Sequence, residues 1–180
     1  LKFLRICFLY LLKFNRYKTL IIQNYGDYRY FKRQKVGCHW ISGSGGTRKK
    51  VGSDEVFILV SRPSKIKFAL EWLRDVKLQD EIIKVVGVST EYKFPPEFVN
   101  IQGIGKVPQT DILASGANFL QPGGSYGEGF PHSLCDALCS GMFIVTDIKT
   151  YRKFGMHKLR CEYSEFNDNL ISIKSVPESN

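Results

Sequence analysis

The order of apolar runs and amphipathic segments limits this chain to an α/β fold. Compact apolar runs of strand length, such as residues 55–61 (EVFILVS), alternate with segments of helical spacing, such as residues 65–76. Continuous apolar runs of this length are typical of strands that are buried on both faces. Strands that alternate with helices form βαβ units. The sequence therefore predicts a Rossmann-like parallel sheet with helices on both faces.

The same pattern places the individual elements along the chain. Strands are predicted at residues 18–23, 36–41, 55–61, 81–88, 99–103, 118–121 and 142–146. Helices are predicted at residues 26–35, 65–76, 109–115 and 131–140. Ligands of such sheets bind beyond the carboxyl ends of the strands, so polar residues just past a strand are the first candidates for a site.

The most linker-like point of the chain is residues 43–46 (GSGG). A length of 180 residues accommodates one domain with a proper core, or one domain and a fragment of another. Ahead of the linker, the apolar residues 3–14 are interrupted by Arg5 and Lys13, so this stretch is too short and too charged to span a membrane. No small-residue cleavage site follows it, and an interior helix of a larger protein, cut at its start, explains it better than a signal peptide.

Charge and cysteine usage restrict the partners. The formal net charge of +9 favours nucleic acid, an anionic membrane surface or a phosphorylated substrate. The densest basic run, residues 48–50, is expected to be a solvated loop, and no predicted helix carries a basic stripe. The five cysteines form no C-x-x-C pair and have no histidine at zinc spacing. We therefore expect small buried thiols, no metal and a reduced, cytoplasmic compartment.

A glycine-rich segment, residues 123–141 (GGSYGEGFPHSLCDALCSG), carries two carboxylates. Glu128 lies on the turn, and Asp136 follows after seven intervening residues, on the predicted helix. The glycines leave backbone N–H groups free, and the helix that begins near Pro131 adds the positive end of its dipole. Carboxylates accept hydrogen bonds from hydroxyls, while N–H groups meet phosphates. The segment therefore suits a ligand that is anionic and rich in hydroxyls, such as a nucleotide sugar.

Two cations follow the strand predicted at residues 55–61. Arg62 ends the strand, and Lys67 comes five residues later, near the start of a helix. Such a pair at the mouth of a parallel sheet can neutralise a diphosphate, Arg through its planar fork and Lys as a point charge. A lysine there opposes the helix dipole, which favours a binding role over a surface charge. Lys65 is a competing candidate, and the spacing favours Lys67.

These residues together resemble the E-x7-E signature of group 1 glycosyltransferases, which are retaining enzymes of the GT-B architecture. The turn Glu128-Gly129-Phe130-Pro131 and the helix end from Asp136 to Gly141 carry the resemblance. Asp136 stands where the family has Glu, and Ser61 and Phe68 replace the glycines that usually flank the two cations. The resemblance covers roughly residues 18–147 and fades after residue 146, where the tail is polar.

The resemblance implies two parts of a GT-B enzyme. Residues 1–46 would be the remnant of the acceptor-side domain with its linker, and residues 47–180 the C-terminal nucleotide-sugar-binding domain. It assigns catalytic roles to Arg62, Lys67 and Glu128. The first acid would contact the donor sugar and the second the ribose hydroxyls, and a strand and glycine turn would line the nucleobase pocket. The donor-binding residues would then be Gly103, Gly129, Phe130, Pro131 and Asp136.

The reaction implied is transfer of a sugar from a nucleotide-diphosphate-sugar donor to a glycan or lipid-linked acceptor, with retention, in surface polysaccharide biosynthesis. The absence of Asp-x-Asp argues against the metal-dependent glycosyltransferase architecture, and no metal or cofactor is expected. We expect a cytoplasmic protein, with peripheral association at the inner face of the membrane left open. A cleft enzyme that lacks one wall is expected to bind donor weakly and turn over little.

Two alternatives stay open at this point. One is a non-catalytic donor-binding fragment, or a subunit of a split glycosyltransferase. The other is a basic α/β domain that binds nucleic acid, which the chain disfavours because its aromatic and basic residues do not cluster. The glycines of the chain lack the G-x-G-x-x-G spacing of dinucleotide-binding proteins, and the P-loop motif G-x-x-x-x-G-K-[ST] does not occur. The sequence therefore does not favour either of these classes. No nucleic-acid partner is therefore expected.

Overall fold

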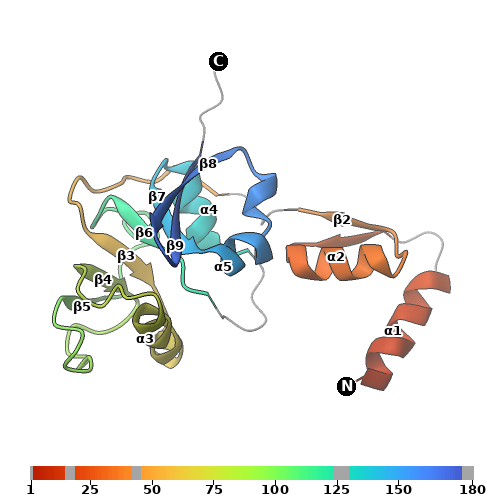
Figure 1. The fold of residues 1–180 in the computed structure, drawn as a ribbon, viewed down its shortest axis with the longest axis horizontal. Coiled ribbons are helices and arrows are strands. Elements are labelled where there is room, and N and C mark those ends of the chain that lie inside the picture. The colour runs from red at the N-terminus through yellow and green to blue at the C-terminus, as the bar shows by residue number, and fades with distance from the viewer. Residues whose placement is uncertain (1, 15–18, 42–45, 124–129, 176–180) are drawn as a thin grey trace, which may run out of the picture.

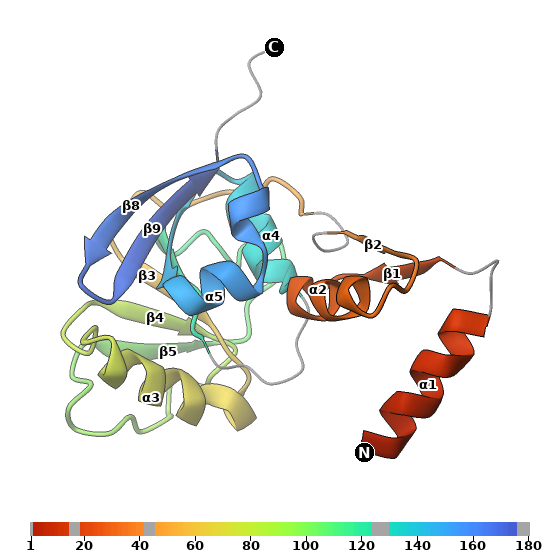
Figure 2. The same cartoon turned by 45° about the vertical axis from the view of Figure 1, so that its right-hand side comes forward.

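A computed structural model describes residues 2–14, 19–41, 46–123 and 130–175, and its two sheets lie on either side of residue 46. The first part contains α1 (Lys2–Phe14), β1 (Leu20–Ile22), α2 (Tyr25–Arg33) and β2 (Cys38–Trp40). Strands β1 and β2 are parallel, with α2 between them in the chain. Figures 1 and 2 show α1 standing apart from both sheets. Residues 20–40 are called the N-terminal unit below.

The larger sheet has seven strands in the order β5-β4-β3-β6-β7-β9-β8. They are β3 (Phe57–Val60), β4 (Ile83–Val86), β5 (Ile101–Gly105), β6 (Asn118–Leu120), β7 (Phe143–Asp147), β8 (Cys161–Asn167) and β9 (Leu170–Ser175). The first five in the spatial order pair in parallel, which confirms the predicted Rossmann-like sheet. Strand β9 pairs antiparallel with both β7 and β8, and neither β8 nor β9 was predicted.

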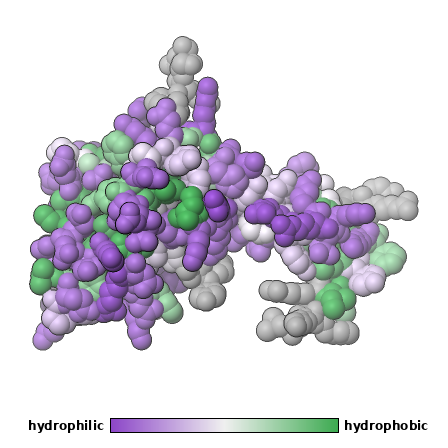
Figure 3. All heavy atoms as spheres, viewed as in Figure 1, coloured by the Kyte–Doolittle hydropathy of each residue, from purple (hydrophilic) through white to green (hydrophobic). Residues whose placement is uncertain are grey.

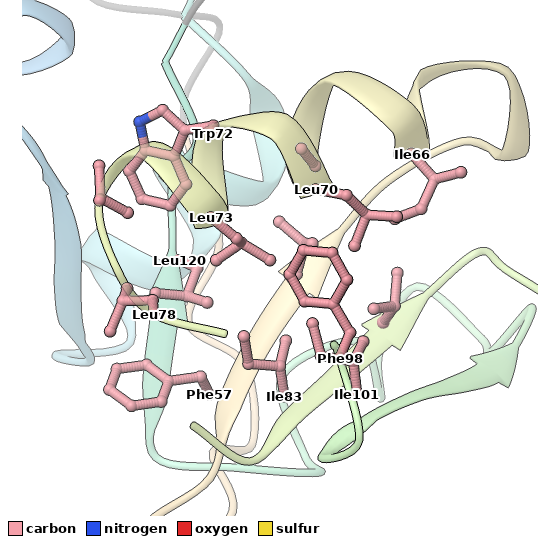
Figure 4. Close-up of a cluster of buried hydrophobic side chains, with 14 of the residues drawn as sticks. Phe57, Ile66, Leu70, Trp72, Leu73, Leu78, Ile83, Phe98, Ile101 and Leu120 are labelled. Carbon is pink, nitrogen blue, oxygen red and sulfur yellow. The ribbon is translucent and has the colours of Figure 1, made fainter. Parts of the chain in front are cut away.

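Helices cover both faces of this sheet, as predicted. A 3₁₀ turn, η1 (Pro63–Lys65), leads into α3 (Ile66–Asp75) on one face, and the other carries α4 (His132–Cys139), α5 (Ile148–Lys153) and η2 (Met156–Lys158). Side chains of β3 alternate between the two cores: Phe57 and Leu59 pack under α3, whereas Ile58 packs on the side of α4. Figure 4 shows the first core, with Leu73 of α3 directed toward the strands. Burial on both faces explains why β3 reads as a continuous apolar run.

The helix predicted at residues 109–115 is wrong, because the structure shows a series of turns there. Its backbone bonds span three residues, from Asp111 N to Pro108 O (2.9 Å) and from Ala114 N to Asp111 O (3.0 Å). The carbonyl of Leu113 instead accepts from the N–H of Gly52 on a neighbouring segment (3.1 Å). So short a segment gains little from helix propagation, and contacts from the rest of the fold decide its conformation.

The strand order places a topological switch point at the carboxyl edge of the sheet. From β3 the chain moves outward to β4 and β5 on one side, and then returns to place β6 on the other side. The connections that leave β3 and β6 therefore run in opposite directions. At such a switch point the loops separate and leave a crevice beyond the strand ends, where α/β proteins bind ligands.

Burial of α3 against the sheet is expected to dominate the stability of this part of the fold. Leu73 is completely buried, whereas Phe68 on the same helix is 57% exposed. Replacing Leu73 with Ala should therefore lower the free energy of unfolding by about 2–5 kcal/mol. The matched change Phe68→Ala should cost about 0.5 kcal/mol or less. Urea denaturation followed by circular dichroism measures both, and equal losses would contradict the described packing.

Candidate functional site

A cavity of about 880 Å³ lies at the switch point. Its wall is formed where β3, β4 and β6 end, by the first turns of α3 and α4, and by the loop after β5. Apolar side chains from the strands, such as Leu59, Val86 and Phe119, form much of the lining. The volume falls within the range of about 300–1,000 Å³ that is usual for small-molecule sites.

Cations gather around this cavity. Arg62, Lys65 and Lys106 line it, together with His132. No Asp or Glu belongs to the described part of the wall. A cavity with low-dielectric walls and charges of one sign attracts ligands of the opposite sign. The described part of the site is therefore suited to an anion.

The geometry of η1 decides which lysine accompanies Arg62. Lys65 donates its N–H to the Arg62 carbonyl at 2.9 Å, closing the 3₁₀ turn. Arg62, the extended N-cap residue of this turn, and Lys65, its last residue, both line the cavity. Lys67 lies farther along on α3, is exposed and does not belong to the wall. The structure thus brings Arg62 together with the competing candidate, Lys65.

Helix α4 presents its first turn to the cavity. Pro131, His132 and Ser133 line the wall, and Pro131 has the extended backbone of an N-cap residue. The preceding residue, Phe130, is buried and also lines the cavity, with its ring 5.8 Å from that of Phe154 after α5. The early N–H groups of a helix have no partner within the helix and carry its positive dipole end. The predicted residues Phe130 and Pro131 therefore lie where an anion would bind.

The remaining predicted residues lie elsewhere or outside the described residues. Glu128 and Gly129 belong to residues 124–129, which the structure does not describe. Gly103 is buried in β5 and does not line the cavity. A side chain at Gly103 would meet the carbonyls of Val88 and Ser89, so the close approach there involves the protein's own backbone. Contacts of these residues with a ligand stay predictions.

Asp136, on α4, holds the segment that contains Thr47 and Lys49. Its Oδ1 accepts a hydrogen bond from the backbone N–H of Thr47 at 2.8 Å, and the Thr47 hydroxyl lies 3.4 Å away. One turn later, the Ser140 hydroxyl accepts from the N–H of Lys49 at 2.8 Å. Asp136 is buried and is absent from the cavity wall. A contact between Asp136 and a ribose stays a prediction.

Asp147 supports the beginning of the glycine-rich segment. Its Oδ2 accepts from Trp72 Nε1 at 2.9 Å and from the Thr150 hydroxyl at 2.8 Å, and its Oδ1 accepts from the Thr150 N–H at 2.9 Å. Gly123, in the cavity wall, packs against this group: a Cβ there would lie 2.6 Å from the Thr150 hydroxyl. Asp147 was not among the predicted residues, although Asp at the end of a strand and ahead of a helix is an N-cap signal.

The N-terminal unit joins the larger sheet through an aromatic cluster. The ring of Tyr25 lies 5.0 Å from Trp40 and 5.1 Å from His157 of η2, both edge to face. Gly155, with φ of 72°, lets this cluster approach, because a Cβ there would lie 2.7 Å from Tyr25 Cγ and 2.9 Å from Trp40 Cζ2. Tyr25, Trp40, Gly155 and His157 are called the aromatic joint below. It fixes the N-terminal unit beside α5, as Figure 2 shows.

Three further observations concern the chemistry and the location of the described residues. Burial raises the pKa of the Cys135 thiol to about 11, so little of the reactive thiolate forms at neutral pH. Among the described residues, no group of three or more His, Cys, Asp or Glu side chains is placed to hold a metal ion. In the same part of the chain, no helix combines the length and apolar character needed to cross a membrane.

Comparisons with known proteins give no relative. The chain matches no protein-family model, no curated protein and no solved structure. The case for a function therefore depends on the site itself.

Removal of the Asp147 carboxylate should destabilise the fold. Asp147→Ala loses a helix cap and two side-chain hydrogen bonds to a charged acceptor, so we expect a loss of about 2–3 kcal/mol in the free energy of unfolding. The control is Asp54→Ala, whose exposed carboxylate lies 3.8 Å from Lys84 Nζ. An exposed pair of this kind contributes about 0–1 kcal/mol. Chemical denaturation compares the two, and an equal, small loss would contradict the assigned role of Asp147.

The aromatic joint should weaken in acid. Partial desolvation of the imidazole, which stays largely exposed, lowers the pKa of His157 below its ordinary value, with added repulsion from Lys158, Arg29 and Arg152. The unfolded chain therefore takes up the proton first, and stability falls as the pH drops through about 6.5. His157→Gln removes this dependence. Thermal unfolding at about pH 7.5 and about pH 5.5 should show a larger fall for the wild type than for the variant. Parallel falls would contradict the interpretation.

Proposed function

We propose that the cavity binds a nucleotide-diphosphate sugar, and that the chain is the donor-binding part of a retaining glycosyltransferase that resembles group 1. The observation that carries the proposal is the position of Arg62, Lys65 and the first turn of α4 around one cavity at the switch point. Nucleotides bind at this point of open α/β sheets. The E-x7-E resemblance of residues 123–141 adds the sugar as the group attached to the diphosphate.

The cations would act on the leaving group. When the bond between the anomeric carbon and the diphosphate breaks, negative charge builds up on the diphosphate oxygens. The guanidinium of Arg62 offers a planar pair of donors, Lys65 a second positive charge and α4 its N–H groups. Groups held in place before the reaction stabilise this charge without having to reorganise. Glu128 would contact the sugar, and this role comes from the resemblance alone.

The rest of the reaction follows from the resemblance in the same way. The acceptor would be a glycan or a lipid-linked intermediate of surface polysaccharide synthesis, and the protein would act in the cytoplasm or at the inner face of the membrane. Donor binding and sugar transfer are separate properties. A donor-binding subunit of a split enzyme would retain the first and depend on a partner for the second. Thermal-shift and calorimetric titrations measure donor binding.

Loss of Arg62 should weaken binding of the diphosphate. Arg62→Ala should reduce the affinity for UDP-, GDP- or ADP-sugars, whichever stabilises the wild type, by about tenfold, because a charge-assisted contact is lost. A thermal-shift screen of these ligands measures the effect. Arg152→Ala is the matched control, since Arg152 is an exposed residue of α5 that does not line the cavity. Equal ligand-induced shifts in the wild type and both variants would remove Arg62 from the site.

The neighbouring lysines offer a sharper comparison. Lys65 lines the cavity and Lys67 does not, although they lie on the same short segment. Lys65→Ala should weaken binding of the same ligand by about three- to tenfold, and Lys67→Ala by about twofold or less. Isothermal titration calorimetry distinguishes the two. A larger effect at Lys67 would restore the residue that spacing alone favours, and would contradict the described wall.

Peripheral contact with an anionic membrane surface is a further part of the proposal, and α1 supports it. Ile6, Tyr10, Leu11 and Phe14 of this helix are 51% to 81% exposed. Figure 3 shows hydrophobic side chains at the end of the molecule that α1 forms. The sequence of α1 contains three basic residues and no acidic one. Apolar faces with flanking cations bind at the surface of anionic bilayers.

A further inference from the structure

The cavity has a wall that does not belong to the seven-stranded sheet. Among the described residues of the N-terminal unit, Gln23 lines it. This residue directly follows β1, and its side chain is exposed. Arg62 and Lys65 lie on the segment after β3, in the larger sheet. The cavity wall thus includes one residue of the N-terminal unit. This residue was not predicted from the sequence.

The backbone of Gln23 accepts one hydrogen bond and is followed directly by the cap of α2. The indole Nε1 of Trp40, at the end of β2, donates to the Gln23 carbonyl at 3.1 Å. The next residue, Asn24, caps α2 by accepting from the N–H of Gly26 at 2.8 Å. These contacts engage the backbone around Gln23 rather than its carboxamide. A side chain on a fixed backbone reaches only a small volume, which is the property needed for selective contact with a ligand.

The unit that carries Gln23 is itself fixed against the larger sheet. In the aromatic joint, Tyr25 is buried and packs on both Trp40 and His157. Trp40 therefore has two contacts of different kinds: its ring packs in the joint, while its N–H holds Gln23. Packing in the joint is thereby linked to the position of Gln23 in the cavity wall.

The chemistry of Gln23 differs from that of the cationic wall. Its carboxamide is neutral and offers both donors and an acceptor, which is the combination that pairs with a hydroxyl. Arg62 and Lys65 suit the charged part of a ligand, and the neutral part requires a neutral polar partner. We propose that Gln23 is a specificity-determining residue whose carboxamide hydrogen-bonds a hydroxyl of the sugar attached to the bound nucleoside diphosphate. This inference rests on the proposed function.

The experiment compares ligands with and without the sugar. UDP, GDP and ADP, and their glucose conjugates, are titrated into the wild type and into Gln23→Leu by isothermal titration calorimetry. The variant should bind the nucleoside diphosphate within about twofold of the wild type, and the glucose conjugate about three- to tenfold more weakly, as expected for one lost hydrogen bond. Gln102→Leu, at an exposed position of β5 outside the cavity, is the matched control.

A second variant tests the positioning by Trp40. Trp40→Phe keeps an aromatic ring in the joint but removes the donor to Gln23, so it should also weaken binding of the conjugate while leaving the nucleoside diphosphate unaffected. A purely structural loss would weaken both ligands equally. If Gln23→Leu leaves the ratio of the two affinities unchanged, the assignment of Gln23 is overturned while the proposed function stands. If the wild type binds no nucleoside diphosphate, the proposed function fails and the inference fails with it.

Discussion

The geometry of the candidate site depends most on the hydrogen bonds that the Asp147 carboxylate accepts. It lies at the end of β7, caps α5 through Thr150 and accepts the indole N–H of Trp72 from α3. Elements on opposite faces of the sheet are therefore tied at its carboxyl edge. Gly123, at the start of the glycine-rich segment, packs so closely against this group that a side chain there would collide with it. Replacing the carboxylate would remove contacts with α3, with α5 and with the segment at Gly123.

The strand order then determines what surrounds the cavity. Because β3 and β6 are neighbours whose connections run in opposite directions, Arg62, Lys65 and the first turn of α4 all reach one cavity. Positive charges around a cavity with apolar walls favour the approach of an anion. Leu59 and Phe119, each buried in one of the two cores, form part of that wall.

The sequence predicted the buried parallel strands well, because burial on both faces leaves a continuous apolar run that no other element of that length shares. It failed where contacts made by distant residues decide the conformation. Residues 109–115 were predicted as a helix, but the Leu113 carbonyl accepts its hydrogen bond from the N–H of Gly52. Strand β9 was missed in a polar tail, although buried Ile171 and Ile173 alternate with Ser172 and Lys174 in the manner of a half-buried strand.

The candidate site likewise contains residues that local sequence patterns locate and residues whose position depends on distant contacts. Arg62, Phe130 and Pro131 lie at the cavity because strand ends and helix starts can be located from local patterns. The choice between Lys65 and Lys67 depended on whether the first turn after β3 is 3₁₀ or α-helical, and spacing in the sequence does not distinguish these. Gln23 could not be found at all, since its position depends on the aromatic joint that docks the N-terminal unit.

The central claim is that the carboxyl edge of the sheet binds the diphosphate of a nucleotide. Backbone amide chemical shifts, recorded by nuclear magnetic resonance during titrations with UDP, GDP and ADP, test it most directly. We expect that with at least one nucleotide the largest shifts occur at the amides of residues 61–62, 64–65, 121, 123 and 132–134. Shifts centred on the opposite edge, around residues 55–57 and 81–83, or none in any titration, would contradict it.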